Sequence, residues 1–240
     1  KDVTATTVED EDASKKAIKS VINRRRHLVL LAQNQTGLNS LFKLISESYH
    51  EENFYRYPRV DYRLLDKYSE GVIAASACLG GPYAGNYWAN REEGPEAVRE
   101  AMRETTRQFV KIFGDRWYGE LQWNNIPEQH ELNQYIIEVC KEFDVTLIST
   151  ADSHYPNTEA WKDRELYKRL GWLGKGTPAW AEDNTELPPG VEEIGYELYP
   201  KNGNQMWDAY KYYSKSGGFE YDDELVMNSI TETHNIAFNR

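Results

Sequence analysis

The residues with the clearest chemical potential stand directly after a strongly apolar stretch. Asp152-Ser153-His154 follows residues 145–150, whose Val, Leu and Ile content is typical of a buried strand. Catalytic groups of α/β folds gather at the carboxyl ends of strands. In an extended Asp-x-His segment both side chains point to the same side, where a carboxylate and an imidazole can ligate one divalent metal or bridge two. The same spacing also occurs in ordinary polar turns, so this pair alone leaves both interpretations open.

Two further residues could join such a site. Cys78 ends a second apolar run, residues 72–78, where a thiolate could be a soft metal ligand or a nucleophile. A small buried hydrophobic residue is the competing interpretation. His27 precedes the apolar run 28–32, so in an all-parallel sheet it would lie at the wrong edge for a shared site. Either that strand is oriented differently, or His27 reaches the site from the other end of the strand.

The remaining candidates are weaker. Glu120 ends a third predicted strand and is a candidate supporting acid, but no partner for it is evident in the sequence. His50 and His130 lie near predicted helix ends and are expected to be exposed, whereas His234 shares an apolar helix face and is expected in the core. Cys140 lies on an apolar helix face and is most simply a core residue. The phosphate-loop, dinucleotide-binding, nucleophile-elbow and CxxC motifs are absent from the sequence.

The elements that must position these residues alternate along the chain. From Gly37 a helical period begins, with Leu38, Leu41, Phe42, Ile45 and Tyr49 on one face. The predicted strands are 27–32, 72–78, 117–122 and 145–150, and the predicted helices are 37–49, 95–113, 127–143, 158–170, 204–214 and 222–238. Alternation of this kind predicts a parallel sheet with covering helices. Four units do not close a barrel of seven or eight strands, so the sheet is open or the first strands of a barrel are missing.

Composition limits the classes of function. The 240 residues include 39 acidic and 28 basic ones, a net charge of −11, which disfavours gripping nucleic acid through bulk charge but allows a polyanion to be held by metal ions. No apolar run approaches the ~18 residues of a membrane span, and no secretory leader is visible. Two cysteines make no disulfide scaffold, so a reducing cytoplasm is expected.

Four segments, taken in order, resemble a known family. They are His27–Asn34 with Thr36-Gly37, then Pro58–Asp61, Glu70–Gly81 and Thr150–Tyr155. Together they are similar to the PHP (polymerase and histidinol phosphatase) domain of bacterial replicative C-family polymerases, the DNA polymerase III alpha subunits, and of their phage-borne relatives. Glu120-Leu121-Gln122 fits a further segment of that family.

The resemblance implies an α/β fold, a distorted seven-stranded, TIM-like β/α barrel, here lacking its first strands. Residues 22–240 would form the C-terminal two-thirds of that barrel, and residues 1–21 a flexible arm. The positions that match ligand-bearing motifs are His27, Cys78, Asp152 and His154, the last two also catalytic. The implied cofactors are divalent ions, zinc or manganese, with magnesium as a further candidate. The family's opening His-x-His motif, its Thr-Asp-His-Gly motif and its next Glu ligand have no counterpart in residues 1–26, so the site is expected to be incomplete.

By this resemblance the function is metal-dependent 3′-5′ exonuclease activity within a DNA-directed DNA polymerase of the bacterial or phage-infected cytoplasm. The implied partners are DNA, held through the parent polymerase, a missing N-terminal PHP segment in cis or in trans, and other replicase subunits; no membrane is implied. The chain alone is expected to be inactive, as a fragment, a split half or a truncated relative. The alternative is an inactive docking module that stabilises the replicase or binds a proofreading subunit. A stand-alone phosphatase is disfavoured by the 58–61 and 76–81 segments.

Overall fold

A computed structural model describes residues 25–55, 57–172 and 197–240, so the arm expected at 1–21 lies outside the described residues. Its centre is a four-stranded sheet with the strand order β1-β4-β5-β6. The strands are β1 (Val29–Ala32), β4 (Val72–Ala75), β5 (Trp117–Gln122) and β6 (Thr146–Thr150). Each begins or ends within a few residues of a predicted strand, because apolar runs mark β1, β4 and β6 and two aromatic residues start β5.

The direction of β1 corrects the expectation of an all-parallel sheet. Strands β4, β5 and β6 are parallel, but β1 pairs antiparallel to β4, with Val29 opposite Ala75. The chain leaves β1 and enters β4 at the same end of the sheet, where the Gln33 N–H donates to the Gly71 carbonyl at 2.9 Å. Two glycines permit this approach, since a Cβ atom on Gly37 would lie 1.9 Å from the Gly71 oxygen. The start of β1 therefore lies beside the end of β4.

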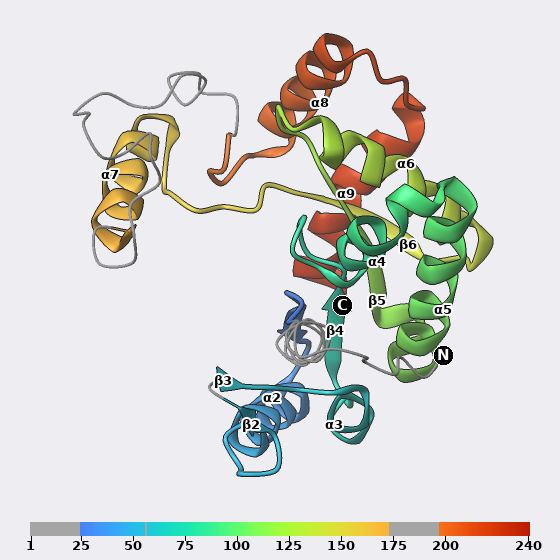
Figure 1. Ribbon diagram of the computed structural model, residues 1–240, viewed down its shortest axis with the longest axis vertical. Helices are drawn as coiled ribbons and strands as arrows, with labels where there is room; N and C mark the ends of the chain where they lie inside the picture. The colour runs from blue at the N-terminus through green and yellow to red at the C-terminus, as the bar shows by residue number, and fades with distance from the viewer. Residues whose placement is uncertain (1–24, 56, 173–196) are drawn as a thin grey trace, which may run out of the picture.

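Helices surround the sheet, and Figure 1 shows their arrangement. Those predicted from periodicity are present, with the first residue of the helix near 158 shifted because Asn157 caps a short 3-10 turn ahead of it. A short helix before β4, another after it, and a two-stranded hairpin were not predicted. The bounds are α2 (Gln35–Ser48), β2 (Phe54–Tyr55), β3 (Tyr57–Pro58), α3 (Tyr62–Lys67), α4 (Pro82–Asn90), α5 (Pro95–Phe113), α6 (Pro127–Glu142), α7 (Trp161–Trp172), α8 (Gly203–Gly217) and α9 (Asp223–Asn239). Within the described ranges, no helix combines the length and apolarity that a membrane span needs.

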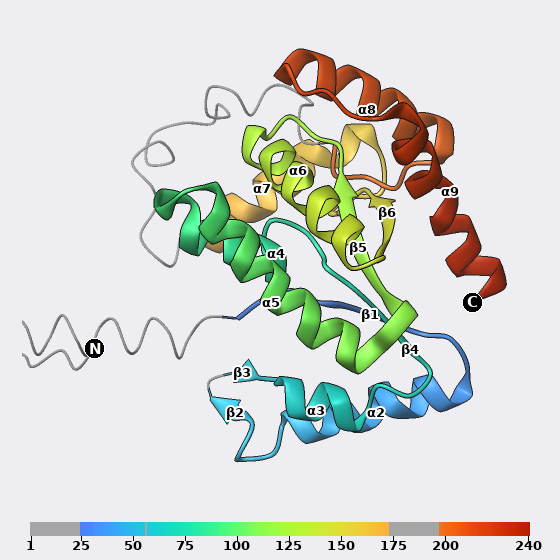
Figure 2. The ribbon, with the colours of Figure 1, turned by 90° about the vertical axis from the view of Figure 1, so that its right-hand side faces the viewer.

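One face of the sheet carries the main core. Helices α4, α5 and α6 lie along this face, as Figure 2 shows. Pro95 starts α5 and Gly114 follows its last residue, as expected. On the inner side of this helix, Val98, Met102 and Phe109 are buried. The Phe109 ring stacks on that of Trp117 with 4.1 Å between the centroids. Burial of such large side chains contributes about 1.5–3 kcal/mol each, so this face supplies most of the stability.

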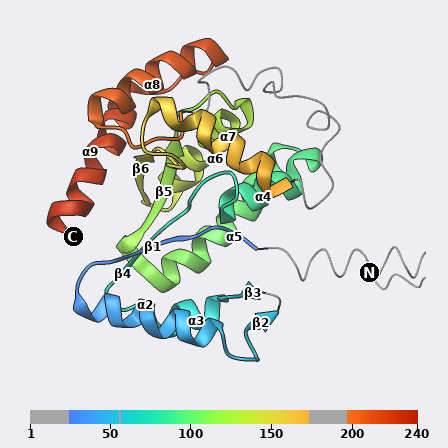
Figure 3. The ribbon, with the colours of Figure 1, turned by 90° about the vertical axis from the view of Figure 1, so that its left-hand side faces the viewer.

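The opposite face of the sheet is thinly covered. Ile73, Ala75, Tyr118 and Ile148 form a small cluster there, against which Ile236 of α9 packs. The neighbouring β1 side chains Val29 and Leu31 remain 38% and 45% exposed. Figure 3 views the molecule from this side, with β1 crossing in front of the other strands. The structure is thus a mixed α/β fold with a four-stranded sheet among the described residues, and the expected seven-stranded barrel is not confirmed.

Helix α2 packs differently from what its periodicity suggests. Most of the apolar face is exposed, including Phe42 at 58% and Tyr49 at 63%, whereas Gly37, Ser40 and Leu44 are buried. The small residues let the helix approach the turn before β4, where the Ser40 hydroxyl donates to the Glu70 carbonyl at 3.0 Å. Close backbone approach has therefore decided which face is inward.

Two histidine expectations were wrong. His130 is buried, at 2% exposure, because its Nε2–H donates to the Asn124 carbonyl and its Nδ1 accepts from the Tyr221 hydroxyl, each at 2.9 Å. His234 is exposed, and its ring lies against that of Phe238 on the same surface of α9. Cys140 is fully buried in the core, as expected.

Candidate metal centre

The carboxyl end of the sheet opens into a cavity of about 620 Å³. Its walls are the sheet face, α9 and the turns that follow β4 and β6. Three of the four predicted site residues, His27, Cys78 and Asp152, line it together with Glu120. The cavity therefore gathers nitrogen, sulfur and oxygen donors that are up to 125 positions apart in the sequence.

His27 and Cys78 are direct neighbours. The His27 Nδ1 lies 3.5 Å from the Cys78 Sγ, and the His27 N–H donates to the Gly80 carbonyl at 2.9 Å. Gly80 allows this contact, because a Cβ atom there would lie 2.9 Å from Nδ1. The antiparallel direction of β1 brings His27 to this edge of the sheet, which resolves the question that the sequence leaves open.

The Cys78 thiol is half-buried between these groups and Asp152. Burial raises the pKa of the thiol, the Asp152 carboxylate raises it further, and a hydrogen bond from the Gly80 backbone partly opposes both. The residue before it, Ala77, has a left-handed backbone with φ of 59°. Without a cation nearby, the thiol is therefore held in its protonated form, and ligation of a metal would release that proton.

The Asp152–His154 segment is not extended. Asp152 has a φ of 46°, so the chain turns at this residue and the two side chains do not simply point the same way. The His154 Nδ1 lies 2.6 Å from the Asp152 carbonyl oxygen and 4.0 Å from its Oδ2. Because a carbonyl only accepts, Nδ1 donates, which leaves the Nε2 lone pair available to a ligand. His154 itself is exposed and lies beside the cavity without lining it.

Glu120 has the partners that its sequence context did not reveal. Its carboxyl group is buried at 3% exposure, with Oε1 accepting from the Ala77 N–H at 2.8 Å and Oε2 from the Thr150 hydroxyl at 2.7 Å. Burial raises the pKa of this carboxyl, and the two hydrogen bonds act in the opposite direction. Sequence reasoning missed Thr150, whose only signal was its place at the end of an apolar strand.

The types of donor atom at this site suit a divalent cation. Imidazole nitrogen, thiolate sulfur and carboxylate oxygen are the ligands that zinc takes in proteins. Within residues 25–55, 57–172 and 197–240, however, no three His, Cys, Asp or Glu side chains converge closely enough to hold an ion. The described residues therefore do not by themselves form a three-ligand metal site.

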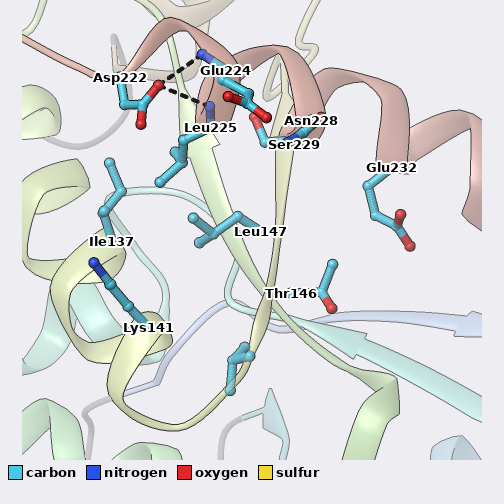
Figure 4. A pocket seen from close by; sticks show the side chains of 11 residues that line it. Ile137, Lys141, Thr146, Leu147, Asp222, Glu224, Leu225, Asn228, Ser229 and Glu232 are labelled. Carbon is cyan, nitrogen blue, oxygen red and sulfur yellow. Dashed lines mark hydrogen bonds between the residues drawn. The ribbon is translucent and has the colours of Figure 1, made fainter.

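A second cavity, of about 410 Å³, lies between α6, β6 and α9. Figure 4 shows that its polar lining consists of carboxylates, the Lys141 amine and small polar side chains, and neither His nor Cys lines it. Asp222 is engaged as the cap of α9, accepting from the Glu224 and Leu225 N–H groups. The cavity at the carboxyl end of the sheet is the better candidate for chemistry.

An α/β domain whose potential metal ligands gather where its parallel strands end carries them at the position typical of functional sites in the α/β class of proteins. A family model, the PHP domain, matches residues 5–124, which is half of the chain. The chain therefore belongs to the PHP domain family.

Three of the similar proteins are DNA polymerase III alpha subunits. DNA polymerase III subunit alpha of Aquifex aeolicus is 48% identical over 133 residues, 55% of this chain and 11% of that protein. The Borreliella burgdorferi subunit is 43% identical over 184 residues, which cover 77% of this chain and 15% of that protein. The Treponema pallidum subunit is 28% identical over 210 residues, which cover 86% of this chain and 16% of that protein. The chain thus spans about a sixth or less of the length of these relatives.

Proposed function

We propose that this chain is the PHP domain of a DNA polymerase III alpha-type replicase and carries part of a divalent-metal site for 3′-5′ exonucleolytic cleavage of DNA. The observation that carries the proposal is the meeting of His27, Cys78 and Asp152 in one cavity at the carboxyl end of the sheet. Homology to DNA polymerase III alpha subunits supplies the substrate class.

The residues of this chain would act as ligands and orienting groups. His27, Cys78, Asp152 and the Nε2 of His154 would hold the cations, with zinc, manganese and magnesium as candidates. When bound, such ions supply Lewis-acid chemistry for the attack of water on phosphorus. The hydrogen bond from Nδ1 of His154 to the Asp152 carbonyl fixes the imidazole tautomer. The remaining ligands would come from an N-terminal PHP segment, in cis or in trans, packed on the thinly covered sheet face.

The test is the Asp152→Asn variant of a complete polymerase that contains this chain. Exonuclease activity is expected to fall by about 100-fold or more, because an amide is a poorer ligand than a carboxylate, while polymerisation stays largely intact. Asp144→Asn is a matched control. Asp144 precedes β6, the strand that Asp152 follows, and it also has a left-handed backbone, with φ of 54°. Unchanged exonuclease activity in the Asp152→Asn variant would contradict the proposal.

A second candidate function is an inactive module that stabilises the replicase or docks a proofreading subunit. It is favoured by one observation, the lack of a three-ligand group among the described residues. In that case Asp152→Asn would leave exonuclease activity unchanged, whereas substitutions that destabilise the domain would weaken polymerase assembly. Exonuclease assays of Asp152→Asn and its control Asp144→Asn therefore separate the two functions.

A further inference from the structure

Glu120 links the two turns that carry the site. It lies on β5, between β4 and β6, and its carboxyl group accepts one hydrogen bond from each side. One donor is the N–H of Ala77, which immediately precedes Cys78. The other is the hydroxyl of Thr150, two residues before Asp152. We call these two hydrogen bonds the Glu120 bridge.

The backbone is in an unfavourable conformation at one end of the bridge and two residues beyond the other end. Ala77 and Asp152 both have left-handed φ values, 59° and 46°. A side chain at such a position costs about 1–3 kcal/mol and persists only where the surroundings determine it. The Glu120 backbone takes part as well, since its N–H donates to the Ser76 hydroxyl at 2.8 Å. The turn after β4 is thus tied to residue 120 by both main chain and side chain.

We propose that Glu120 is a positioning residue, which holds Cys78 and Asp152 at a fixed separation through the Glu120 bridge. Its two carboxyl oxygens are engaged by Ala77 and Thr150, so it acts through the turns. Its role as part of a metal site rests on the proposed function. The bridge itself can be tested without metal or DNA.

The reactivity of Cys78 can be used to test the Glu120 bridge. Of its two cysteines, Cys140 is fully buried with a pKa raised to about 12 by burial, while Cys78 is half-buried in the cavity. Alkylation of the native chain by iodoacetamide should therefore report on Cys78. The Cys78→Ser variant, which should stay unlabelled while folded, checks that assignment.

Two substitutions separate the bridge from the charge of Glu120. In Glu120→Gln the amide oxygen can still accept from Ala77 and the amide nitrogen can donate to Thr150. In Glu120→Met the side chain has similar length but no hydrogen bonds, so the buried Ala77 N–H is left unpaired. Alkylation of Cys78 is expected to be about tenfold faster in Glu120→Met, as loss of two buried hydrogen bonds implies, and to stay near the wild-type rate in Glu120→Gln.

A matched control is Thr106→Val, which removes a buried hydrogen bond to Tyr83 in the main core. It should lower global stability without changing the alkylation rate. Equal rates in Glu120→Met and wild type would overturn the proposal. Equally fast alkylation of the Gln and Met variants would also overturn it, because charge would then be the cause. Should Glu120→Met fail to fold, Thr150→Val decides, since a faster rate supports the bridge and an unchanged rate refutes it.

The outcome is independent of the exonuclease test. An unchanged alkylation rate in Glu120→Met, together with loss of exonuclease activity in Asp152→Asn, would refute the Glu120 bridge alone. Faster alkylation in Glu120→Met, together with unchanged exonuclease activity in Asp152→Asn, would keep the Glu120 bridge and refute the proposed metal chemistry.

Discussion

Burial sets the protonation state of single side chains in this domain. His130 is enclosed by Asn124 and Tyr221, which use both ring nitrogens of the neutral imidazole. Burial lowers the pKa of His130 below its ordinary value of 6.5. A charged imidazole would need solvation that this part of the core does not offer. The residue that the sequence suggested to be exposed is therefore a buried, neutral hydrogen-bonding centre.

This neutral histidine predicts a pH dependence of stability. Below pH 6.5 the unfolded chain binds a proton at this position that the folded chain resists, so stability is lost as the pH falls from 6.5 toward the lowered folded pKa. The loss should reach at most about 1.4 kcal/mol per pH unit from this group. Urea unfolding of wild type and His130→Gln at several pH values measures it. The variant is expected to show a flatter profile in this window, and identical profiles would contradict the assignment.

At the scale of elements, α2 shows that an apolar stripe need not face the core. Close approach of Gly37 to Gly71 and the hydrogen bond from Ser40 fix the inward face. Leu44 is the large side chain on that face, 4% exposed, whereas Phe42 lies on the outer side. The exposed stripe contributes little to the stability of the isolated domain.

Two substitutions in the same helix test this orientation. Leu44→Ala should destabilise the domain by about 2–5 kcal/mol, because it opens a cavity in the core. Phe42→Gln should change stability by no more than about 0.5 kcal/mol, as expected for an exposed position. Chemical denaturation of both variants provides the comparison. A larger loss for Phe42→Gln than for Leu44→Ala would show that α2 is rotated.

At the scale of the whole molecule, the sheet is covered unequally. Helices α4, α5 and α6 bury one face, while the cavity and the exposed β1 side chains Val29 and Leu31 occupy the other. The candidate ligands lie at the border of this open face. A segment packed on this open face would therefore cover these apolar side chains and lie next to the candidate ligands.

The lack of a three-ligand group among the described residues predicts weak metal binding by these 240 residues alone. After gel filtration in metal-free buffer, elemental analysis should find less than one zinc or manganese ion per chain, and no nuclease activity should be measurable. Weak binding of added zinc should weaken further in Cys78→Ser, because the thiolate is its softest ligand. Two or more tightly held ions per chain would contradict the prediction.

The sequence by itself determined most of the elements and the family. Apolar runs located β4 and β6, Pro95 and Gly114 delimited α5, and the four ordered motifs indicated a PHP domain. These features are local, since hydrophobic period, capping and turn chemistry act within a few residues. For the same reason Cys140 could be assigned to the core from its helix face alone.

Only the tertiary structure decided which residues meet. The direction of β1, which brings His27 beside Cys78, depends on contacts between Gly37 and Gly71 that no local pattern encodes. The partners of Glu120 lie in the turn after β4 and at the end of β6, 43 and 30 positions away. The inward faces of α2 and α9, and the burial of His130, likewise follow from long-range packing. Strand direction and helix rotation are fixed by contacts between distant segments, so they appear only when the chain is folded.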